Sequence, residues 1–343
     1  MKAIVYSETG DAGVMSVVER EVPQPGPGEV RVRVVVSGVN PTDWKARAGG
    51  STRERSAEES VPNQDGAGVV DAVGPGVNDL AVGDRVWIYL AAPDYGTTGT
   101  AQEFTVQPEH HVVKLPEGAS LDVGASLGVP AMTAHRALTV AEDGPSRLAP
   151  GALEGRVVLV AGGAGAVGHA AIQLARWAGA TVVTTVSGPE KEVLARAAGA
   201  HHVINYRTDD VVSRVREVAP GGVDVVVEVS LAQNLGIDLA VVKPRGVVAV
   251  YANDGGNQVS LEIGAGMGPN VRLQFVLLYT VGEAVMRAAA QDVSAAVADG
   301  ALPVGQEHGL PLLRFGFGDL AGAHDAVERG AVGKVLVDVG KEE

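Results

Sequence analysis

The stretch VVLVAGGAGAVGHAAIQLARWAGATVVTTVS at residues 157–187 constrains the fold of this chain more than any other feature. Four apolar β-formers run into a glycine cluster, an alanine-rich amphipathic segment follows, and a second β-branched run ends the stretch. Strand, turn, helix and strand in this order are typical of a dinucleotide-binding fold. The chain is therefore expected to contain a doubly wound parallel sheet.

The glycine cluster has the spacing G-x-G-x-x-G, formed by Gly163, Gly165 and Gly168. Because the chain contains 46 glycines, the spacing alone is weak evidence, and the prediction depends on the strand before the motif and the helix after it. Small residues let the backbone approach a pyrophosphate, and the N–H groups of Ala166 and Val167 at the helix start point at its charge. We expect these residues to bind a dinucleotide; a merely tight structural turn is the alternative.

The end of the second strand favours NADPH over NADH. An NAD enzyme usually has Asp or Glu there, which accepts a hydrogen bond from the ribose 2′-hydroxyl. This chain has Ser187 instead, so a 2′-phosphate meets no repulsion, and Lys191 can supply a positive charge. Glu190 is a competing acid beyond the strand end, and Lys191 could also be an ordinary residue of the first helical turn.

Two domains are expected in a chain of 343 residues. Short alternating β-runs broken by Gly and Pro predict a barrel-like β domain first, and six apolar strands alternating with helical segments then predict a Rossmann domain. The last β-run, GKVLVDV, has no partner in that six-strand pattern and is expected to return to the first domain. We assign residues 1–127 and 279–343 to a catalytic domain and residues 128–278 to the NADPH-binding domain.

Composition excludes several other classes of protein. Cysteine is absent, which removes disulfides, thiol catalysis and thiolate metal ligands. A formal charge of −14 disfavours a broad nucleic-acid-binding surface. No apolar stretch is long enough to span a membrane, and the first residues, MKAIVYSETG, lack the apolar segment of a signal peptide. We expect a cytoplasmic protein that binds neither membrane nor nucleic acid.

Several motifs, in order along nearly the whole chain, resemble the zinc-free quinone oxidoreductases of the medium-chain dehydrogenase/reductase superfamily. Besides the glycine loop they are GVNPTDWKARAG (38–49), VPNQDGAGVVDAVGPGV (61–77), VGDRV (82–86), LGVPAMTAHRAL (127–138), AGAHHVINYR (198–207) and GKVLV (333–337). The resemblance implies an α/β protein with an N-terminal GroES-like β-barrel domain and a Rossmann doubly wound parallel sheet. It also implies a homodimer that uses NADPH.

The resemblance also indicates that no metal is bound. Zinc enzymes of the superfamily carry Cys where this chain has Asn40, His-Glu where it has Gln64 and Asp65, and a further Cys near Pro130. Asn and Gln are poor ligands for zinc. The histidine pairs 110–111 and 201–202 are expected in strands, where neighbours face opposite sides and cannot chelate together.

Loss of zinc favours a conjugated acceptor. Reduction of an isolated carbonyl needs a Lewis acid or a proton donor, whereas a quinone or enone delocalises the charge of the incoming hydride. We therefore expect an NADPH-dependent quinone oxidoreductase. The alternatives are an enone or enoyl reductase of specialised metabolism, with Tyr95, Tyr251 or Tyr279 as proton donor, and a non-catalytic, crystallin-like NADPH-binding protein.

The resemblance assigns roles to individual residues. It places Asn40, Asp43 and Trp44 beside the nicotinamide, with Asn40 as a hydrogen-bond donor, although Asp43 could be only an internal anchor and Trp44 only wall packing. The residues expected to bind the cofactor, besides the glycine loop with Ala166 and Val167, are Thr133, Ser187, Lys191, Tyr206, Asn234, Tyr251, Asn253 and Lys334. Tyr206 could instead cap a strand. The loops 49–60 and 139–155 are lid candidates or solvated surface loops.

Overall fold

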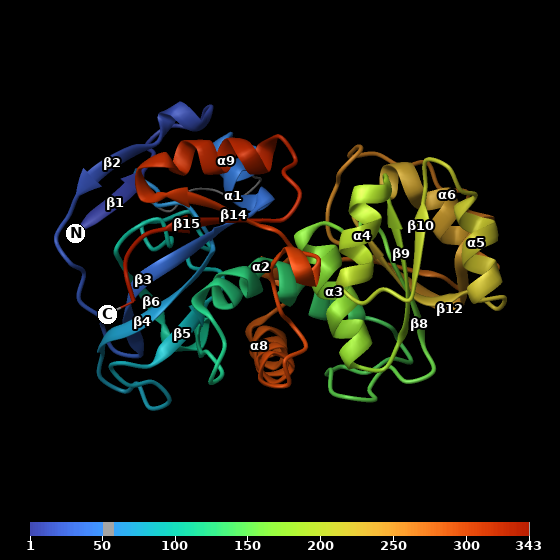
Figure 1. The fold of residues 1–343 in the computed structure, drawn as a ribbon, viewed down its shortest axis with the longest axis horizontal. Helices are drawn as coiled ribbons and strands as arrows, with labels where there is room; N and C mark the ends of the chain where they lie inside the picture. Colours follow the sequence, from blue (N-terminus) through green and yellow to red (C-terminus); the bar gives the residue numbers. More distant parts are fainter. Residues whose placement is uncertain (51–57, 343) are drawn as a thin grey trace. The chain divides into compact units, whose positions relative to one another are not determined.

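The computed structural model describes residues 1–50 and 58–342 and divides into two compact units (Figure 1). The first comprises residues 1–129 and 311–343, and the second comprises residues 130–310. Most of the expected loop at 49–60 falls on residues 51–57, which lie outside the described residues.

The described part of the first unit is built on a seven-stranded sheet with a small antiparallel pair beside it. Along the sheet the order is β14-β15-β3-β4-β5-β7, and β6 pairs with β3. The strands are β1 (Lys2–Val5), β2 (Ser16–Glu19), β3 (Glu29–Val39), β4 (Asp65–Val73), β5 (Arg85–Ile88), β6 (Phe104–Pro108), β7 (Val112–Lys114), β14 (Leu312–Gly316) and β15 (Lys334–Asp338). Helices α1 (Pro41–Arg47) and α9 (Leu320–Glu328) belong to the same unit.

The return of the last strand to the first unit is confirmed. β15 runs antiparallel to β3, with Leu336 opposite Gly38 and Val335 opposite Val39. Buried Val39, Leu320 and Val335 share one apolar cluster, which fixes α9 against this part of the unit. The pairing brings the start of β15 beside the end of β3, where α1 begins.

The second unit, all of whose residues are described, has a six-stranded parallel sheet in the order β10-β9-β8-β11-β12-β13. Its strands are β8 (Val157–Val160), β9 (Thr181–Val186), β10 (His202–Asn205), β11 (Val223–Glu228), β12 (Val242–Val250) and β13 (Arg272–Phe275). The strand order reverses direction between β8 and β11, which is where doubly wound sheets bind ligands. The expected fold class is confirmed.

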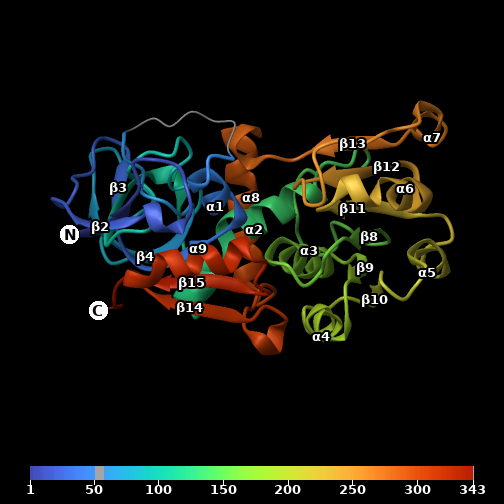
Figure 2. The same cartoon turned by 90° about the horizontal axis from the view of Figure 1, so that it is seen from above.

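Helices cover both faces of this sheet, with α3 and α4 on one side and α5 and α6 on the other (Figure 2). Their bounds are α3 (Ala166–Trp177), α4 (Pro189–Ala197), α5 (Val211–Val218), α6 (Leu231–Val241), α7 (Ile263–Met267) and α8 (Glu283–Ala298). α2 (Leu121–Leu138) spans the point at which the chain passes from one unit to the other. Apolar side chains such as Val226, Val241 and Val248 form a buried core between the sheet and the α5–α6 layer.

The second boundary between the units differs from the expected one at 278/279. The structure keeps α8 in the second unit because Asp292 anchors it there. The Asp292 carboxylate accepts a hydrogen bond from the backbone of Leu148 at 2.8 Å, contacts His135 Nε2 at 2.8 Å and pairs with Arg147. This polar anchor joins residues distant in sequence, so it left no local signal at the expected boundary.

The placement of His110 and His111 in a strand is wrong. Both lie in a single 3₁₀ turn (Glu109–His111), and β7 begins only at Val112. The two rings meet edge to face with centroids 4.5 Å apart. His202 begins β10, and His201 precedes that strand.

Candidate cofactor site and active site

The glycine motif forms the turn between β8 and α3, and its glycines are required for different reasons. A Cβ on Gly168 would lie 2.4 Å from the carbonyl oxygen of Gly162, and a Cβ on Gly163 would lie 2.1 Å from Thr184 Oγ1. A Cβ on Gly165 would meet only the Gly162 oxygen, at 3.5 Å. Gly163 and Gly168 therefore allow close internal packing, whereas Gly165 leaves space at the helix start.

Gly162 is a fourth glycine that the motif spacing did not single out. Its φ of +70° lies in the left-handed region, which glycine adopts without steric cost. Its carbonyl accepts the N–H of Gly165 at 3.0 Å, so the turn is closed by its own backbone. The available signal was the unbroken run of small residues at 161–166, AGGAGA.

The amino end of α3 is suited to an anion. Gly165 occupies the N-cap without a side-chain cap, and the first turn contains no acidic residue. The first N–H groups of a helix have no intrahelical partner, so those of Ala166 and Val167 are available for a ligand. Backbone dipoles add partial positive charge at this end. The local geometry fits the pyrophosphate of a dinucleotide.

A cavity of about 480 Å³ adjoins this turn at the carboxyl ends of β8, β9 and β11. It is lined by Leu159, Ala161, Gly162, Thr185, Tyr206, Val211, Glu228, Val229, Ser230, Gln233, Asn234, Ile237 and Asp238. Of the predicted cofactor residues, the structure brings Tyr206 and Asn234 to this cavity. Thr133 is buried within α2 and is not among the lining residues.

Ser187 and Tyr206 follow the neighbouring strands β9 and β10, and Lys191 lies in the helix after β9. Lys191 is in the first turn of this helix, α4. The Tyr206 N–H donates to the carbonyl of Val186 at 3.1 Å, which holds Tyr206 next to the end of β9. Glu190 shares the first turn of α4 with Lys191.

Two buried acids at the cavity were missed by the sequence analysis. Glu228 ends β11 and accepts hydrogen bonds from the backbone of Ser230 and, at 3.0 Å, from the Asn234 amide. Burial raises the pKa of Glu228. Burial also raises the pKa of Asp238 on α6 to about 9, and the negative charge of Glu228 adds to this shift. The available signal was an acid within an otherwise apolar segment, although β11 also contains Asp224.

Tyr251 and Asn253 follow β12 and lie against the end of β11. The Tyr251 N–H donates to the Glu228 carbonyl at 3.0 Å, and Asn253 forms an isolated β-bridge with Ser230. Burial raises the pKa of the Tyr251 hydroxyl well above its ordinary value, and the charges of Glu228 and Asp254 add to the shift. This environment opposes proton donation that leaves a tyrosinate behind.

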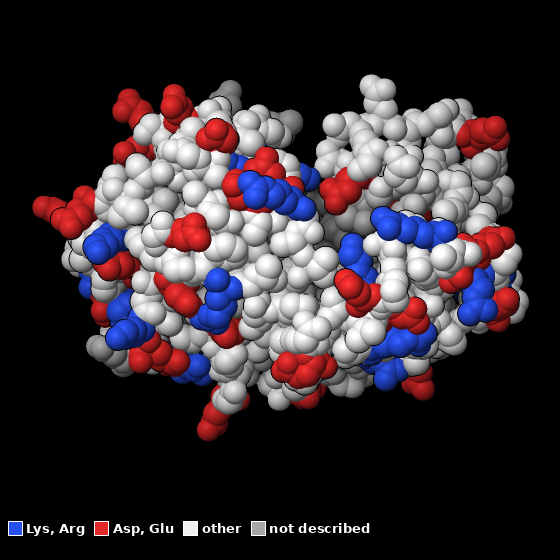
Figure 3. All heavy atoms as spheres, turned by 45° about the horizontal axis from the view of Figure 1, so that its top comes forward, with Lys and Arg blue, Asp and Glu red and all other residues white. Residues whose placement is uncertain are grey.

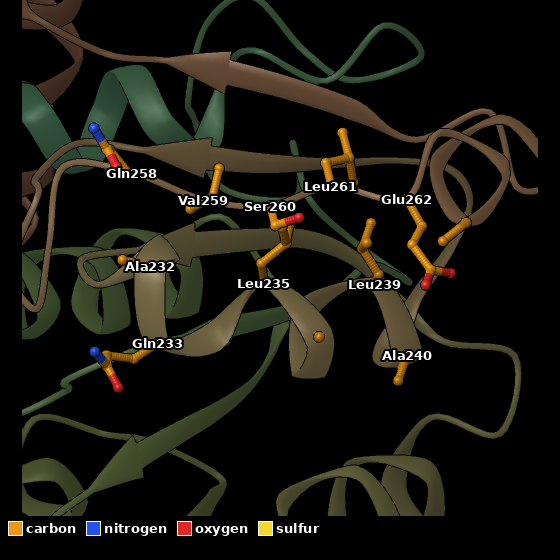
Figure 4. A pocket seen from close by; sticks show the side chains of 12 residues that line it. Ala232, Gln233, Leu235, Leu239, Ala240, Gln258, Val259, Ser260, Leu261 and Glu262 are labelled. Atoms are coloured by element: carbon orange, nitrogen blue, oxygen red, sulfur yellow. The ribbon is translucent and has the colours of Figure 1, made fainter.

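A second cavity in this unit, of about 580 Å³, lies between α6 and residues 258–265. Figure 4 shows side chains of α6, such as Leu235 and Leu239, across from those of the extended segment, such as Leu261. Gln233 and Glu262 lie at the ends of this group. The lining is mainly aliphatic and includes none of the glycine-turn residues, so this cavity does not have the features of a pyrophosphate site.

In the first unit, Asn40, Asp43, Asp65 and Lys334 form a buried polar cluster. Asn40 Nδ2 donates to Asp65 Oδ2 at 2.7 Å. Lys334 Nζ donates to Asn40 Oδ1 at 2.7 Å and to Asp65 Oδ2 at 3.1 Å. The structure thus places Lys334, predicted to bind the cofactor, on the Asn40 amide. From the sequence, Asp65 was expected only to stand where the zinc enzymes have a metal ligand, and its pairing with Asn40 and Lys334 was not predicted.

Asp43 braces the start of α1. Its carboxylate accepts the N–H of Asn40 at 2.7 Å and that of Gln64 at 3.1 Å. Burial raises the pKa of Asp43 to about 8, and the nearby Asp65 charge contributes. These contacts correspond to the internal-anchor alternative. Trp44, the next residue, is half-buried, with the ammonium of Lys45 at 5.8 Å from its ring centroid.

The residues at the positions of zinc ligands do not fit zinc. The Gln64 amide is paired with the backbone of Ala92 through both its nitrogen, at 2.7 Å, and its oxygen, at 3.1 Å. The Lys334 ammonium already contacts Asn40 and Asp65, so a second cation there would be repelled. In the part of the chain that the structure describes, no group of three or more His, Asp or Glu side chains could hold a metal ion.

A G-x-S-x-G pentapeptide occurs at residues 124–128, a pattern also found around catalytic serines. Ser126 lies inside α2, not on a strand-to-helix turn, and its hydroxyl donates to the Asp122 carbonyl at 2.7 Å. It therefore lacks the exposed position of a hydrolase nucleophile.

Comparison with known proteins agrees with this architecture. A model described as an alcohol dehydrogenase GroES-like domain matches residues 26–117, and one described as a zinc-binding dehydrogenase matches residues 166–295. These two domains in this order define a medium-chain dehydrogenase/reductase, an oxidoreductase class that uses a nicotinamide cofactor.

Individual relatives narrow the class to a family. The chain is 36% identical to a 2-haloacrylate reductase of Burkholderia sp over 260 residues, which cover 75% of this chain and 74% of the relative. It is 33% identical to the quinone oxidoreductase of Lama guanicoe over 257 residues, covering 74% of each chain. A mycobacterial protein solved in complex with NADPH is 31% identical, with a TM-score of 0.81 and coverage of 98% of this chain and 99% of the other. The chain belongs to the quinone oxidoreductase family of the medium-chain dehydrogenase/reductases.

No helix in the described residues is long and apolar enough to cross a membrane. On the face drawn in Figure 3, basic side chains lie singly or beside acidic ones.

Proposed function

We propose that the protein is an NADPH-dependent reductase of quinones or conjugated enones that needs no metal. The observation that carries the proposal is the buried cluster of Asn40, Asp65 and Lys334, which offers hydrogen bonds and a fixed ammonium where the zinc enzymes hold their metal. With no ligand set for a Lewis acid, the acceptor must delocalise the charge that hydride transfer creates. A quinone or an enone does so through its conjugated system.

The second unit supplies the proposed NADPH site. The turn at Gly162–Gly165 and the amino end of α3 hold the pyrophosphate, and the adjoining cavity takes the adenosine side at Tyr206. Asn234 contributes to the nicotinamide side. Lys191 can pair with the 2′-phosphate of NADPH. Ser187 stands where an NAD enzyme usually has an acid, so no carboxylate repels that phosphate. NADPH supplies the hydride, and the protein residues bind and orient it and the acceptor.

The remaining residues have supporting roles in this proposal. Asn40 donates a hydrogen bond to the acceptor oxygen, and Asp43 holds the α1 start in place through two backbone N–H groups. Trp44 contributes to the wall beside the nicotinamide. Thr133, Tyr251 and Asn253 contribute to the nicotinamide side of the cofactor site.

Two relatives bear on the acceptor. One is named a quinone oxidoreductase, and the other a reductase of 2-haloacrylate, whose C=C bond is conjugated with a carboxylate. Both names describe conjugated acceptors. The second relative favours enone or enoate reduction as the alternative substrate class for this chain.

The deciding experiment compares a quinone, a conjugated enone and a saturated aldehyde with NADPH labelled stereospecifically with deuterium. We expect turnover of the quinone or the enone, deuterium in the enone product and little turnover of the aldehyde. Elemental analysis should find substoichiometric zinc. Faster turnover of the aldehyde, or one tightly bound zinc per chain with activity lost to chelators, would contradict the proposal. NADPH binding without turnover of any acceptor would support the non-catalytic alternative.

We also propose that the protein is a homodimer that uses the β13 edge. β13 ends the order of the six-stranded sheet, so one row of its backbone groups has no strand partner in this unit. Large apolar side chains on and near β13 are exposed, namely Ile263, Met267, Phe275 and Leu277. An exposed apolar edge strand is a template for pairing with a second copy.

A further inference from the structure

The contacts of Asn40 fix which way its amide group faces. A lysine ammonium can only donate hydrogen bonds, and an ionised carboxylate can only accept them. Lys334 Nζ lies 2.7 Å from one end of the Asn40 amide, and Asp65 Oδ2 lies 2.7 Å from the other. The oxygen therefore faces Lys334 and the NH₂ group faces Asp65. One hydrogen of that NH₂ group is used by Asp65, which leaves the second to donate to a ligand.

The contact of Lys334 with the Asn40 oxygen makes the free N–H a stronger donor. A cation on the carbonyl oxygen of an amide withdraws electron density from its nitrogen, and hydrogen bonds in series polarise one another. Burial strengthens this effect because little water screens the charges, and the exposed fractions are 2% for Asn40, 0% for Asp65 and 1% for Lys334.

The surrounding backbone is shaped around this arrangement. A Cβ on Gly38, opposite Leu336 in the β3–β15 pairing, would lie 3.1 Å from Lys334 Nζ and 2.2 Å from a backbone oxygen of α2. A Cβ on Gly128 would lie 2.0 Å from Asp65 Oδ1, and the adjacent Val129 N–H donates to that oxygen at 2.8 Å. Because residues 38 and 128 are glycines, no Cβ atom pushes the Lys334 ammonium or the Asp65 carboxylate out of its position.

We propose that Lys334 is a positioning residue for the reduction, because it orients and polarises the Asn40 amide so that the free N–H stabilises the acceptor oxygen as it gains negative charge. This inference rests on the proposed function. For an enone, the hydride forms a C–H bond at the β-carbon, the C=C pair shifts toward the carbonyl, and the oxygen becomes an enolate. Solvent then protonates the enolate, and the nicotinamide that lost the hydride is left oxidised. Lys334 thus acts through one amide and replaces part of the polarisation that a metal gives.

The test needs a variant that keeps the buried charges balanced. Lys334→Met alone would leave Asp65 as an unpaired buried carboxylate, which is strongly destabilising. The informative variant combines Lys334→Met with Asp65→Asn, in which residue 65 can still accept from Asn40. A matched control combines Arg314→Met with Asp338→Asn, which removes the ion pairs of Arg314 with Asp338 and Asp122, neither of which contacts Asn40.

We expect the Lys334/Asp65 variant to lose roughly 10- to 100-fold in the single-turnover rate of enone reduction, less than or similar to the loss of one oxyanion donor. The KM for NADPH should change little. Across enones of graded carbonyl basicity, the rate should depend more steeply on the substituent than in the unaltered protein. The Arg314/Asp338 control should retain both the rate and the slope.

A second readout does not depend on turnover. The resonance of the Asn40 N–H that does not donate to Asp65, assigned by its loss in Asn40→Ala, should move upfield in the Lys334/Asp65 variant and stay in place in the control. A folded Lys334/Asp65 variant with unaltered rate, slope and resonance would overturn the inference while leaving the proposed function intact. An unaltered protein that reduces no conjugated acceptor would contradict the proposed function, and the resonance would then decide whether Lys334 polarises the amide.

Discussion

Asp238 shows how one buried residue can impose a pH dependence on the whole protein. Its pKa is raised from 3.8 to about 9 by burial and by Glu228. The folded protein therefore keeps a proton that the unfolded chain releases above its ordinary pKa. Because the folded state binds more protons in this range, the free energy of unfolding falls as pH rises from about 4 toward about 9.

Asp238→Asn should remove this dependence. We expect the variant to gain stability relative to the unaltered protein as the pH is raised through this window. The difference should be smallest near pH 4, close to the ordinary pKa of 3.8. Urea denaturation across the range measures the difference. The exposed Asp79→Asn serves as a control that should show no such trend. A constant difference at every pH would contradict the argument.

Lys191 is the residue on which cofactor preference should depend. A charge-assisted contact with the 2′-phosphate contributes about 1.5–3 kcal/mol, so Lys191→Ala should weaken NADPH binding about 10- to 100-fold. The affinity for NADH should be unchanged because NADH lacks the 2′-phosphate. Fluorescence titration with both cofactors measures this. Arg196→Ala, on the same helix and paired with Glu192, is the control that should leave both affinities alone.

At the scale of elements, the β8–α3 turn separates glycines that look equivalent in the motif. Gly168→Ala would bring a methyl group within 2.4 Å of the Gly162 oxygen, so we expect loss of stability as well as of cofactor binding. Gly165→Ala meets only an ordinary contact at 3.5 Å, so the protein should fold normally and lose dinucleotide affinity through crowding of the ligand. Thermal melts paired with NADPH titrations distinguish the two. Equal destabilisation by both variants would contradict this division of roles.

The apolar pattern of the sequence predicted some strands and helices and missed others. The strands from β8 to β13 were expected because each is an apolar run between helical segments, and β15 was expected because it had no place among them. The short strand β14 and the helix α9 were not expected, because their half-buried patterns resemble surface loops. α9 is held by its packing against β15 and β14, which no local pattern reveals.

At the scale of the whole molecule, the β13 edge is where association is expected. Phe275→Glu places a charge on a residue that is 68% exposed at this edge, and we expect it to convert the dimer to monomers. Light scattering coupled to size-exclusion chromatography measures the mass. Val193→Glu alters an apolar residue of α4 that is 64% exposed and should leave the mass unchanged. A monomeric unaltered protein would contradict the proposed interface.

The sequence alone determined the two-domain α/β architecture, the glycine turn and the return of the last strand, because each follows from local periodicity or from short spacing along the chain. It also predicted Tyr206 and Asn234 as cofactor residues; both line one cavity, and their role in binding stays a prediction.

Only the tertiary structure decided the contacts that give the sites their chemistry. Asn40 and Lys334 lie at opposite ends of the sequence and meet because β15 pairs with β3, and Asp238 meets Glu228 because α6 packs back on β11. The shift of the Asp238 carboxyl and the orientation of the Asn40 amide arise from burial beside particular charges. Burial and long-range pairing are properties of the folded chain, so no spacing in the sequence encodes them directly.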